Sequence, residues 1–449
     1  MTANDDTFFD IHMHALNLSH PYFYAFVKRY KLDMRWFLGI GIISLLAYVA
    51  SLFLGRTLRS FITRKQNTFN NLLSVFENDI GSFFLITENC LREKENPLLN
   101  GRELSIGTRK YKSMVLTPLM MDFGYKGKRK DSDFHYSRPA EKPIVEQVTD
   151  VFNAIKKYKQ SAATRPDDDL CQKFPSLEPG TTRVIEIYPF LGINTRNYKL
   201  DKIKTMLDQY FNGYKGSRED LLKNMGQFDG NIGNIKSNYF AGVKVYPPLG
   251  FDPWPADGEE QEKVEEQKKV DYLYCYCARH GIPITSHGGD GGFIAIDDKN
   301  DLREYTSMSR WESVLEHYPS LKLNIAHLPA EFWPKRILAK PQYKLEKQRL
   351  MAIIDLVTKK DNVYTDFSCR ALNDEYYMYL KEVINSRSSE EDKYKLRSRI
   401  LFGSDYAVNL GSIESYNRYL DIFSRTEHLT AEEKHLFCSV NPERFLFHS

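Results

Sequence analysis

The amino-acid sequence predicts a (β/α)8 barrel, in which eight parallel strands form a closed core and helices surround them. Short apolar runs recur along the chain, and each is followed by loop residues and then by a helical pattern. The last five runs begin about 40 residues apart, which is the length of one strand, one helix and two connecting loops. With the earlier runs they number eight, the number of βα units that closes such a barrel.

The first crossover of this barrel is unusually long. The predicted strands cover residues 8–11, 114–120, 183–188, 242–246, 283–285, 321–326, 363–367 and 399–402. The gap between the first two is too long for one βα unit. We therefore expect a helical insertion over residues 20–110, carried within a single barrel domain that spans residues 1–449.

The insertion contains a strongly apolar stretch, residues 36–54, which has no charged side chain. As a helix it would be about 28 Å long, at about 1.5 Å per residue, close to the thickness of a bilayer core. Basic residues flank it on both sides, and a second, more polar helix is expected over residues 58–76. A single membrane crossing would separate the first strand from the other seven, so the barrel could not close.

Two interpretations of residues 36–54 therefore stay open. The helix is either buried against the barrel or a second copy of the chain, giving a homo-oligomer, or it forms a hairpin with residues 58–76 that enters the membrane surface to a shallow depth. Peripheral membrane contact is favoured, because a charge-free run of this length is rarer in soluble helices than at membranes.

Composition restricts the partners and the compartment. Lys plus Arg total 62 and Asp plus Glu total 59, so the net charge of +3 gives no overall field that would hold nucleic acid. The six cysteines are scattered without a C-x-x-C pair, and the first residues are polar and acidic. We expect a cytoplasmic protein, which can also contact the membrane surface. Its expected partner is a small molecule.

Several predicted strands end on residues that bind metal ions. His12 and His14 are two apart at the end of the first strand, so both imidazoles point to one side. His287 ends the fifth strand, His327 the sixth and Asp405 the eighth. The carboxyl ends of barrel strands meet on one face, where catalytic groups are found. His12, His14, His287 and Asp405 together supply a donor set that suits Zn2+.

These segments resemble the amidohydrolase superfamily of metal-dependent barrels, and within it the branch that includes aminocarboxymuconate-semialdehyde decarboxylase. The resemblance rests on residues 10–14 (DIHMH), 118–122 (PLMMD), 242–248 (GVKVYPP), 281–287 (GIPITSH), 324–327 (NIAH), 403–405 (GSD) and 441–444 (NPER). It excludes the insertion, and residues 36–54 depart from the family's pattern.

The resemblance implies that His12, His14, His287 and Asp405 hold one divalent metal, Zn2+ first and Mn2+ or Fe2+ as alternatives. His327 would stand beside the substrate as an acid, a base or a polarising group. Lys244 lies where some members of the superfamily carry a carboxylated lysine that bridges two metals, in which case His327 would ligate the second. The other interpretations of Lys244 are an ion pair and an anchor for a substrate carboxylate.

The leading functional prediction is a metal-dependent hydrolase that acts on a small, carboxylate-bearing substrate through activated water. Asp405 would accept the proton of the water, and Lys244 would hold the anionic substrate. Asp366, at the end of the seventh strand, is expected to hydrogen-bond a ligating histidine. The alternatives are a nonoxidative metal-dependent decarboxylase and a catalytically silent barrel that serves as a scaffold.

Overall fold

The computed structural model describes most of the barrel and only part of the insertion. The described residues are 6–21, 68, 70–77, 79–93, 95–124, 142–161, 183–255, 261–330 and 341–447. The apolar stretch 36–54 lies outside them, as does most of the predicted helix 58–76, of which residues 70–76 are helical. The predictions of membrane or subunit contact through residues 36–54 therefore stay predictions.

Parallel strands form two sheets that correspond to the predicted series. The first sheet has the order β1-β5-β6 and the second has the order β12-β11-β10-β9-β8-β7. Their bounds are β1 (Thr7–Met13), β5 (Ser113–Pro118), β6 (Ile185–Ile187), β7 (Phe190–Gly192), β8 (Gly242–Val245), β9 (Ile284–Ser286), β10 (Leu323–Ile325), β11 (Val363–Asp366) and β12 (Ile400–Leu401). The predicted third strand, 183–188, corresponds to β6, and the sequence did not predict β7, which continues the same barrel position after Pro189, a residue with no N–H to donate to a neighbouring strand.

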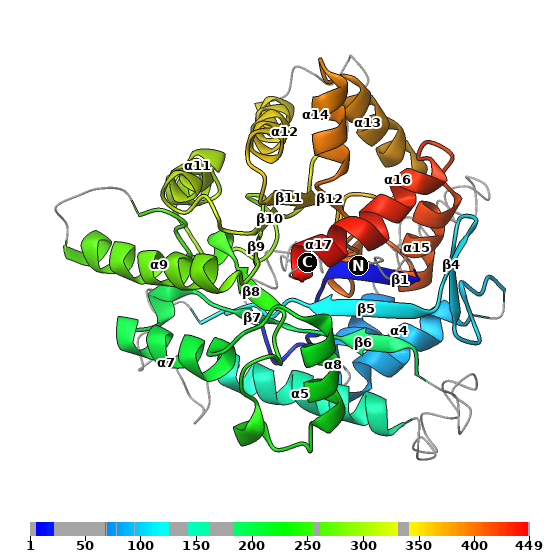
Figure 1. The fold of residues 1–449 in the computed structure, drawn as a ribbon, viewed down its shortest axis with the longest axis horizontal. Coiled ribbons are helices and arrows are strands. Elements are labelled where there is room, and N and C mark those ends of the chain that lie inside the picture. The colour runs from blue at the N-terminus through cyan, green and yellow to red at the C-terminus, as the bar shows by residue number, and fades with distance from the viewer. Residues whose placement is uncertain are drawn as a thin grey trace, which may run out of the picture.

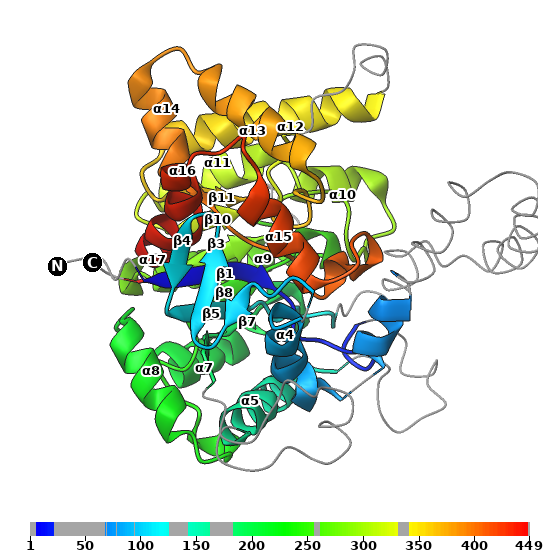
Figure 2. The ribbon, with the colours of Figure 1, turned by 90° about the vertical axis from the view of Figure 1, so that its right-hand side faces the viewer.

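Backbone hydrogen bonds join the two sheets at both of their junctions. Ile11 N donates to Phe402 O over 3.2 Å between the first and last strands, and Met120 N donates to Phe190 O over 3.1 Å at the other junction. The strand order and the parallel pairing therefore close a barrel, and the predicted (β/α)8 fold is confirmed. Figure 2 shows β1 and β5 side by side, as their pairing requires.

Helices follow the strands and cover the outside of the barrel (Figure 1). Their bounds are η1 (Ile80–Ser82), α4 (Phe83–Leu91), α5 (Ile144–Gln160), η4 (Thr195–Asn197), α7 (Leu200–Phe211), α8 (Arg218–Gln227), η5 (Ile232–Asn234), η6 (Pro247–Leu249), α9 (Gln261–His280), α10 (Lys299–Tyr305), α11 (Met308–His317), α12 (Pro341–Lys359), α13 (Asp374–Asn385), α14 (Glu390–Arg397), η7 (Val408–Gly411), α15 (Tyr416–Arg425), α16 (Ala431–His435), the π-helix η8 (Leu436–Val440) and α17 (Asn441–Leu446). Within the described ranges, none of these helices combines the length and the apolar character that a membrane crossing needs.

Helix α15 illustrates how the local sequence sets these elements. Ser415 caps its first turn by accepting a hydrogen bond from Arg418 N. Tyr416, Tyr419 and Phe423 recur at helical spacing and are fully buried, so one face of the helix packs onto the barrel while the other stays polar.

The insertion between β1 and β5 contains a small sheet that the sequence analysis did not predict. Strands β2 (Leu99–Asn100), β3 (Glu103–Ile106) and β4 (Arg109–Tyr111) form an antiparallel meander after α4. Gly101 and Gly107 turn its two hairpins with φ of 57° and 60°, a conformation that favours glycine. Gly107 N donates to Ser424 Oγ over 2.8 Å, which ties the meander to the end of α15.

Candidate metal centre at the carboxyl ends of the strands

The structure brings the predicted site residues together at the carboxyl ends of the barrel strands. His12 lies within β1 and His14 directly after it, while His287, His327 and Asp405 follow β9, β10 and β12. All five side chains are buried, with residue exposures between 0% for His12 and 7% for His287. Residues almost four hundred positions apart therefore face one another in a dry environment, where electrostatic interactions are strong.

His12 and His14 are each fixed through Nδ1. His12 Nδ1 donates to Asp366 Oδ2 over 3.0 Å, and His14 Nδ1 donates to the carbonyl oxygen of Leu119 over 2.8 Å. Carboxylate and carbonyl oxygens only accept hydrogen bonds, so each Nδ1 carries the proton. In the neutral imidazole the other nitrogen, Nε2, then holds a lone pair.

His287 and His327 are fixed in the same manner through different nitrogens. His287 Nε2 donates to Gly291 O over 3.0 Å, and His327 Nδ1 donates to Ser368 O over 2.9 Å. In the neutral form of each ring, the lone pair is therefore on His287 Nδ1 or on His327 Nε2. Burial also lowers the pKa of His327 to about 3, which keeps its ring neutral.

The second ring nitrogens of the histidines and the carboxylate of Asp405 converge on one place. His287 Nδ1 lies 3.0 Å from His327 Nε2, and His14 Nε2 lies 3.1 Å from Asp405 Oδ1. His12 Nε2 is 3.5 Å from the same carboxylate oxygen and has no hydrogen-bond partner among the described residues. One donor atom each from His12, His327 and Asp405 lies within 4.8 Å of the others. A cluster of facing acceptors fits a divalent cation.

Asp366 supports this cluster from below, as the sequence analysis expected for a group that hydrogen-bonds a ligating histidine. Besides His12 Nδ1 it accepts hydrogen bonds from Asn324 Nδ2 over 2.7 Å, from His327 N over 3.2 Å and from Ser368 N over 3.0 Å. Burial alone would raise the pKa of Asp366, but His12, His327 and a hydrogen bond from Ser368 Oγ hold that pKa well below its usual range. Asp366 therefore stays ionised and fixes the tautomer of His12.

The backbone is strained at three of the strand ends that face the site. His327, Cys369 and Asp405 have φ of 67°, 60° and 63°, in the left-handed region that non-glycine residues rarely adopt. Asp405 N donates to His12 O over 2.7 Å and so holds the last strand against the first. Burial would raise the pKa of Asp405, yet His14, His327 and His12 keep it well below its usual range, so the carboxylate is charged.

Lys244 lies on β8 beneath the cluster and is 1% exposed. Its Nζ has no hydrogen-bond partner among the described residues. Burial lowers the pKa of Lys244 to about 8, and the charges of Asp366 and Asp405 oppose this shift. The side chain is near both carboxylates electrostatically, but it is not one of the residues that line the adjoining cavity.

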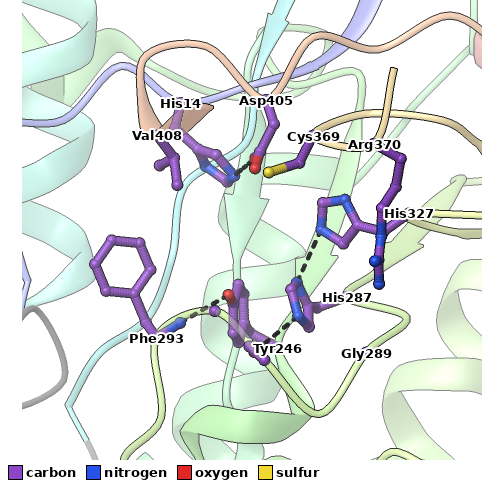
Figure 3. A pocket seen from close by; sticks show the side chains of 12 residues that line it. His14, Tyr246, His287, Gly289, Phe293, His327, Cys369, Arg370, Asp405 and Val408 are labelled. Atoms are coloured by element: carbon purple, nitrogen blue, oxygen red, sulfur yellow. Dashed lines mark hydrogen bonds and ion pairs between the residues drawn. The ribbon is translucent and has the colours of Figure 1, made fainter. Parts of the chain in front are cut away.

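A cavity of about 220 Å3 opens above the cluster (Figure 3). The Tyr246 ring stacks on His287 with 4.2 Å between ring centroids, and its hydroxyl accepts a hydrogen bond from Phe293 N over 3.1 Å. The lining residues are His14, Tyr246, His287, Gly289, Gly291, Gly292, Phe293, His327, Cys369, Arg370, Asp405 and Val408. Its volume is below the roughly 300–1,000 Å3 of sites for drug-sized ligands, so it fits a small molecule.

The sequence did not predict five of the residues that line the cavity, namely Tyr246, Phe293, Cys369, Arg370 and Val408. Cys369 and Arg370 lie three and four residues past the end of β11, so their place just past a predicted strand end was the available signal. Phe293 directly follows a glycine-rich run, and nothing local marks Val408.

One family model matches the second half of the chain. Residues 234–447 match a family model described as Amidohydrolase, a range that includes Lys244, His287, His327 and Asp405. A search of curated proteins gives no match.

Solved structures that resemble the chain are distant from it. A 5-carboxyvanillate decarboxylase from Novosphingobium aromaticivorans, crystallised with manganese, is 12% identical with a TM-score of 0.35 over 74% of this chain and 76% of that chain. A probable 2-pyrone-4,6-dicarboxylic acid hydrolase from Acinetobacter baumannii is 12% identical with a TM-score of 0.35 over 75% and 84% of the two chains. A dihydroorotase from Saccharomyces cerevisiae is 12% identical with a TM-score of 0.32 over 74% and 76%. At these TM-scores none of the three indicates a reaction for this chain.

Proposed function

Because this chain belongs to the amidohydrolase superfamily, we propose that it is a metal-dependent hydrolase that acts on a small, carboxylate-bearing substrate. One observation carries the proposal. Four imidazoles each donate a hydrogen bond to the protein through one ring nitrogen, and their second nitrogens gather around a charged carboxylate in a buried site. Packing alone would not require four ring nitrogens to be placed around one buried carboxylate.

The cation would be held by His12, His14, His287 and Asp405, and we favour Zn2+ over Mn2+ and Fe2+ because the donors are mainly imidazoles. When bound, the cation would supply Lewis acidity for the substrate and lower the pKa of water at the site. Asp405 is charged and lies at the strand end nearest His14, so it is the group in place to accept a proton from water.

His327 is equipped to accept rather than to donate. Its Nδ1 proton is used by Ser368 O, and its Nε2 lone pair faces His287 Nδ1. We therefore favour a role in which Nε2 accepts a proton or a ligand over a role as a general acid. Lys244 Nζ lies 5.5 Å from the centroid of the Tyr246 ring and has no hydrogen-bond partner among the described residues, which supports the alternative of a second cation at His287 and His327, with a modified Lys244 as a further ligand.

The test is to measure metal content and reaction products on the same preparation. We expect at least one divalent metal per chain and water-dependent cleavage of a small ester, amide or lactone that carries a carboxylate. Release of CO2 without hydrolysis would replace this proposal with a nonoxidative decarboxylase. A metal content near zero, with no turnover after incubation with Zn2+ or Mn2+, would instead support a catalytically silent barrel that serves as a scaffold.

The proposed setting follows from composition. A nearly balanced charge supports a small-molecule partner rather than nucleic acid. We propose a cytoplasmic enzyme that contacts the membrane surface, or a second copy of itself, through residues 36–54.

A further inference from the structure

Charged side chains are sparse around the cavity above the metal centre. Among the described residues that line it, Arg370 is the only lysine or arginine, and Asp405 is the only aspartate or glutamate. Asp405 belongs to the candidate metal centre. Arg370 is therefore the lining residue whose positive charge an anionic ligand would meet. We propose that Arg370 binds an anionic group of the substrate, which replaces Glu346 as its partner, an inference that rests on the proposed function.

The backbone holds Arg370 in a fixed position relative to the metal centre. Arg370 N donates to Phe367 O over 3.2 Å, and Arg370 O accepts from Leu372 N over 2.9 Å. Two residues earlier, Ser368 O accepts the proton of His327 Nδ1. The turn that carries Arg370 therefore also orients His327, and both side chains line the cavity (Figure 3). A ligand on Arg370 would be held at a set distance from the reacting groups.

The ion pair between Arg370 and Glu346 is weak enough to be exchanged. Arg370 Nη2 lies 3.4 Å from Glu346 Oε2, and the two side chains are 27% and 24% exposed. An ion pair this exposed stabilises little. Glu346 keeps a closer partner in Arg349 Nη1, at 2.9 Å, and Arg349 in turn pairs with Asp290 at 3.2 Å. When a ligand takes Arg370, Glu346 is therefore not left as an unpaired charge.

The other candidate for this role was Lys244, and its position argues against it. Lys244 is 1% exposed and does not line the cavity, whereas the guanidinium of Arg370 reaches it. A guanidinium also matches a carboxylate with two parallel hydrogen bonds, which an ammonium cannot make. Tyr246, Phe293 and Val408 give the cavity an apolar wall, so the ligand class is a small carboxylic acid with a flat, apolar body.

Calorimetric titration of the full-length, zinc-loaded protein tests this with two probes of the same shape, isophthalate and 3-carbamoylbenzoate. Each carries one carboxylate that the metal can take, and they differ in whether the second group is charged. We expect the parent to prefer isophthalate by about tenfold or more, as for a charge-assisted hydrogen bond. Arg370→Met should abolish this preference, and Arg370→Lys should keep part of it.

Two further variants make the test specific. Glu346→Gln removes the competing carboxylate and should tighten isophthalate binding several-fold. Arg303→Met is the matched control, because Arg303 is exposed and lines a neighbouring groove instead of the cavity, so the preference should not change.

The inference is overturned if the parent shows no preference, if folded Arg370→Met retains it, or if Lys244→Met abolishes it while Arg370→Met does not. These outcomes are separate from the fate of the proposed function. If the parent shows the Arg370-dependent preference but hydrolyses no substrate, the proposed hydrolase function is wrong and anion binding by Arg370 still stands. If the parent hydrolyses a substrate but the preference for isophthalate survives Arg370→Met, the hydrolase function stands and anion binding by Arg370 is wrong.

Discussion

His287 Nδ1 and His327 Nε2 lie 3.0 Å apart, and in the neutral rings each presents a lone pair to the other. This follows from their other nitrogens, which donate to the carbonyl oxygens of Gly291 and Ser368. Two acceptors at hydrogen-bond distance repel each other in a buried site unless a positive charge joins them. The pair, together with His12, His14 and Asp405, therefore makes metal content the property of this protein most worth measuring.

Removing the metal should destabilise the fold. Dialysis against a chelator should lower the melting temperature by several degrees, because a ligand that binds only the folded state stabilises it, by about 2.7 kcal/mol at one hundred times its dissociation constant. Differential scanning calorimetry before and after dialysis measures the shift. Adding back Zn2+ or Mn2+ should restore it, and Mg2+ should not, since imidazoles are poor ligands for Mg2+. An unchanged melting temperature would contradict the metal centre.

Substitution of single histidines should separate ligands from bystanders. His287→Ala should lose metal and activity together, whereas His317→Ala, which removes an exposed histidine far from the cavity, should lose neither. His327→Ala decides the number of metals. If one metal is bound, the variant should retain most of it and lose rate; elemental analysis that finds two metals in the parent and one in the variant would establish a second site.

Asp366→Asn should weaken the metal centre although it replaces none of the proposed metal ligands. The amide has one acceptor oxygen in place of two, so it cannot serve His12, Asn324, His327 N and Ser368 together. Loss of such a supporting hydrogen bond typically costs about 10- to 100-fold in metal affinity or activity. Competition with a fluorescent chelator measures the affinity. Asp361→Asn, at a carboxylate that is 90% exposed, is the control; equal affinities for both variants would contradict the role of Asp366.

Asp252 should make the stability of the protein fall as the pH rises from about 4 to about 7. Burial raises the pKa of Asp252 to about 6, although Arg310 opposes the shift. The pKa of Asp252 is near 3.9 in the unfolded chain and about 6 in the folded protein. At a pH between these two values the folded state binds a proton that the unfolded state has released. The bound proton's stabilising effect is therefore full at the acidic end and is lost above pH 6.

The matching variant is Asp252→Asn, in which this decrease should be smaller by up to about 3 kcal/mol, since a tenfold change in proton affinity is worth about 1.4 kcal/mol. Urea unfolding at pH 4.5 and at pH 7 gives the two free energies for each protein. Asp361→Asn again serves as the control and should follow the parent. A variant whose decrease equals that of the parent would show that Asp252 does not titrate in this range.

Residues 36–54 should direct the protein to membranes. We expect full-length protein to sediment with the membrane fraction, and protein lacking residues 33–60 to stay in the supernatant, because a charge-free helix of this length partitions to an interface. Leu45→Glu with Leu46→Glu is a milder variant that keeps the chain length and should have the same effect. A full-length protein that stays in the supernatant as a defined oligomer, and becomes monomeric on deletion, would make this segment a subunit interface.

The sequence by itself determined the barrel and most of the metal centre. Strand positions follow from local apolar runs, and in a closed parallel barrel every strand end faces the same side, so His12, His287, His327 and Asp405 could be assigned to one site from their places in the runs. Asp366 could be placed beneath a histidine for the same reason, and the hydrogen bond to His12 confirms it.

The tertiary structure decided what depends on contacts between distant segments. Which nitrogen of each histidine keeps a lone pair is set by acceptors such as Leu119 O and Ser368 O, and no local pattern specifies these partners. The sequence suggested Lys244 as a substrate anchor and did not single out Arg370, yet of these two residues Arg370 is the one that lines the cavity. The physical reason is that strand position fixes the height of a side chain in the barrel, while burial and access depend on how the loops from other strands close over it.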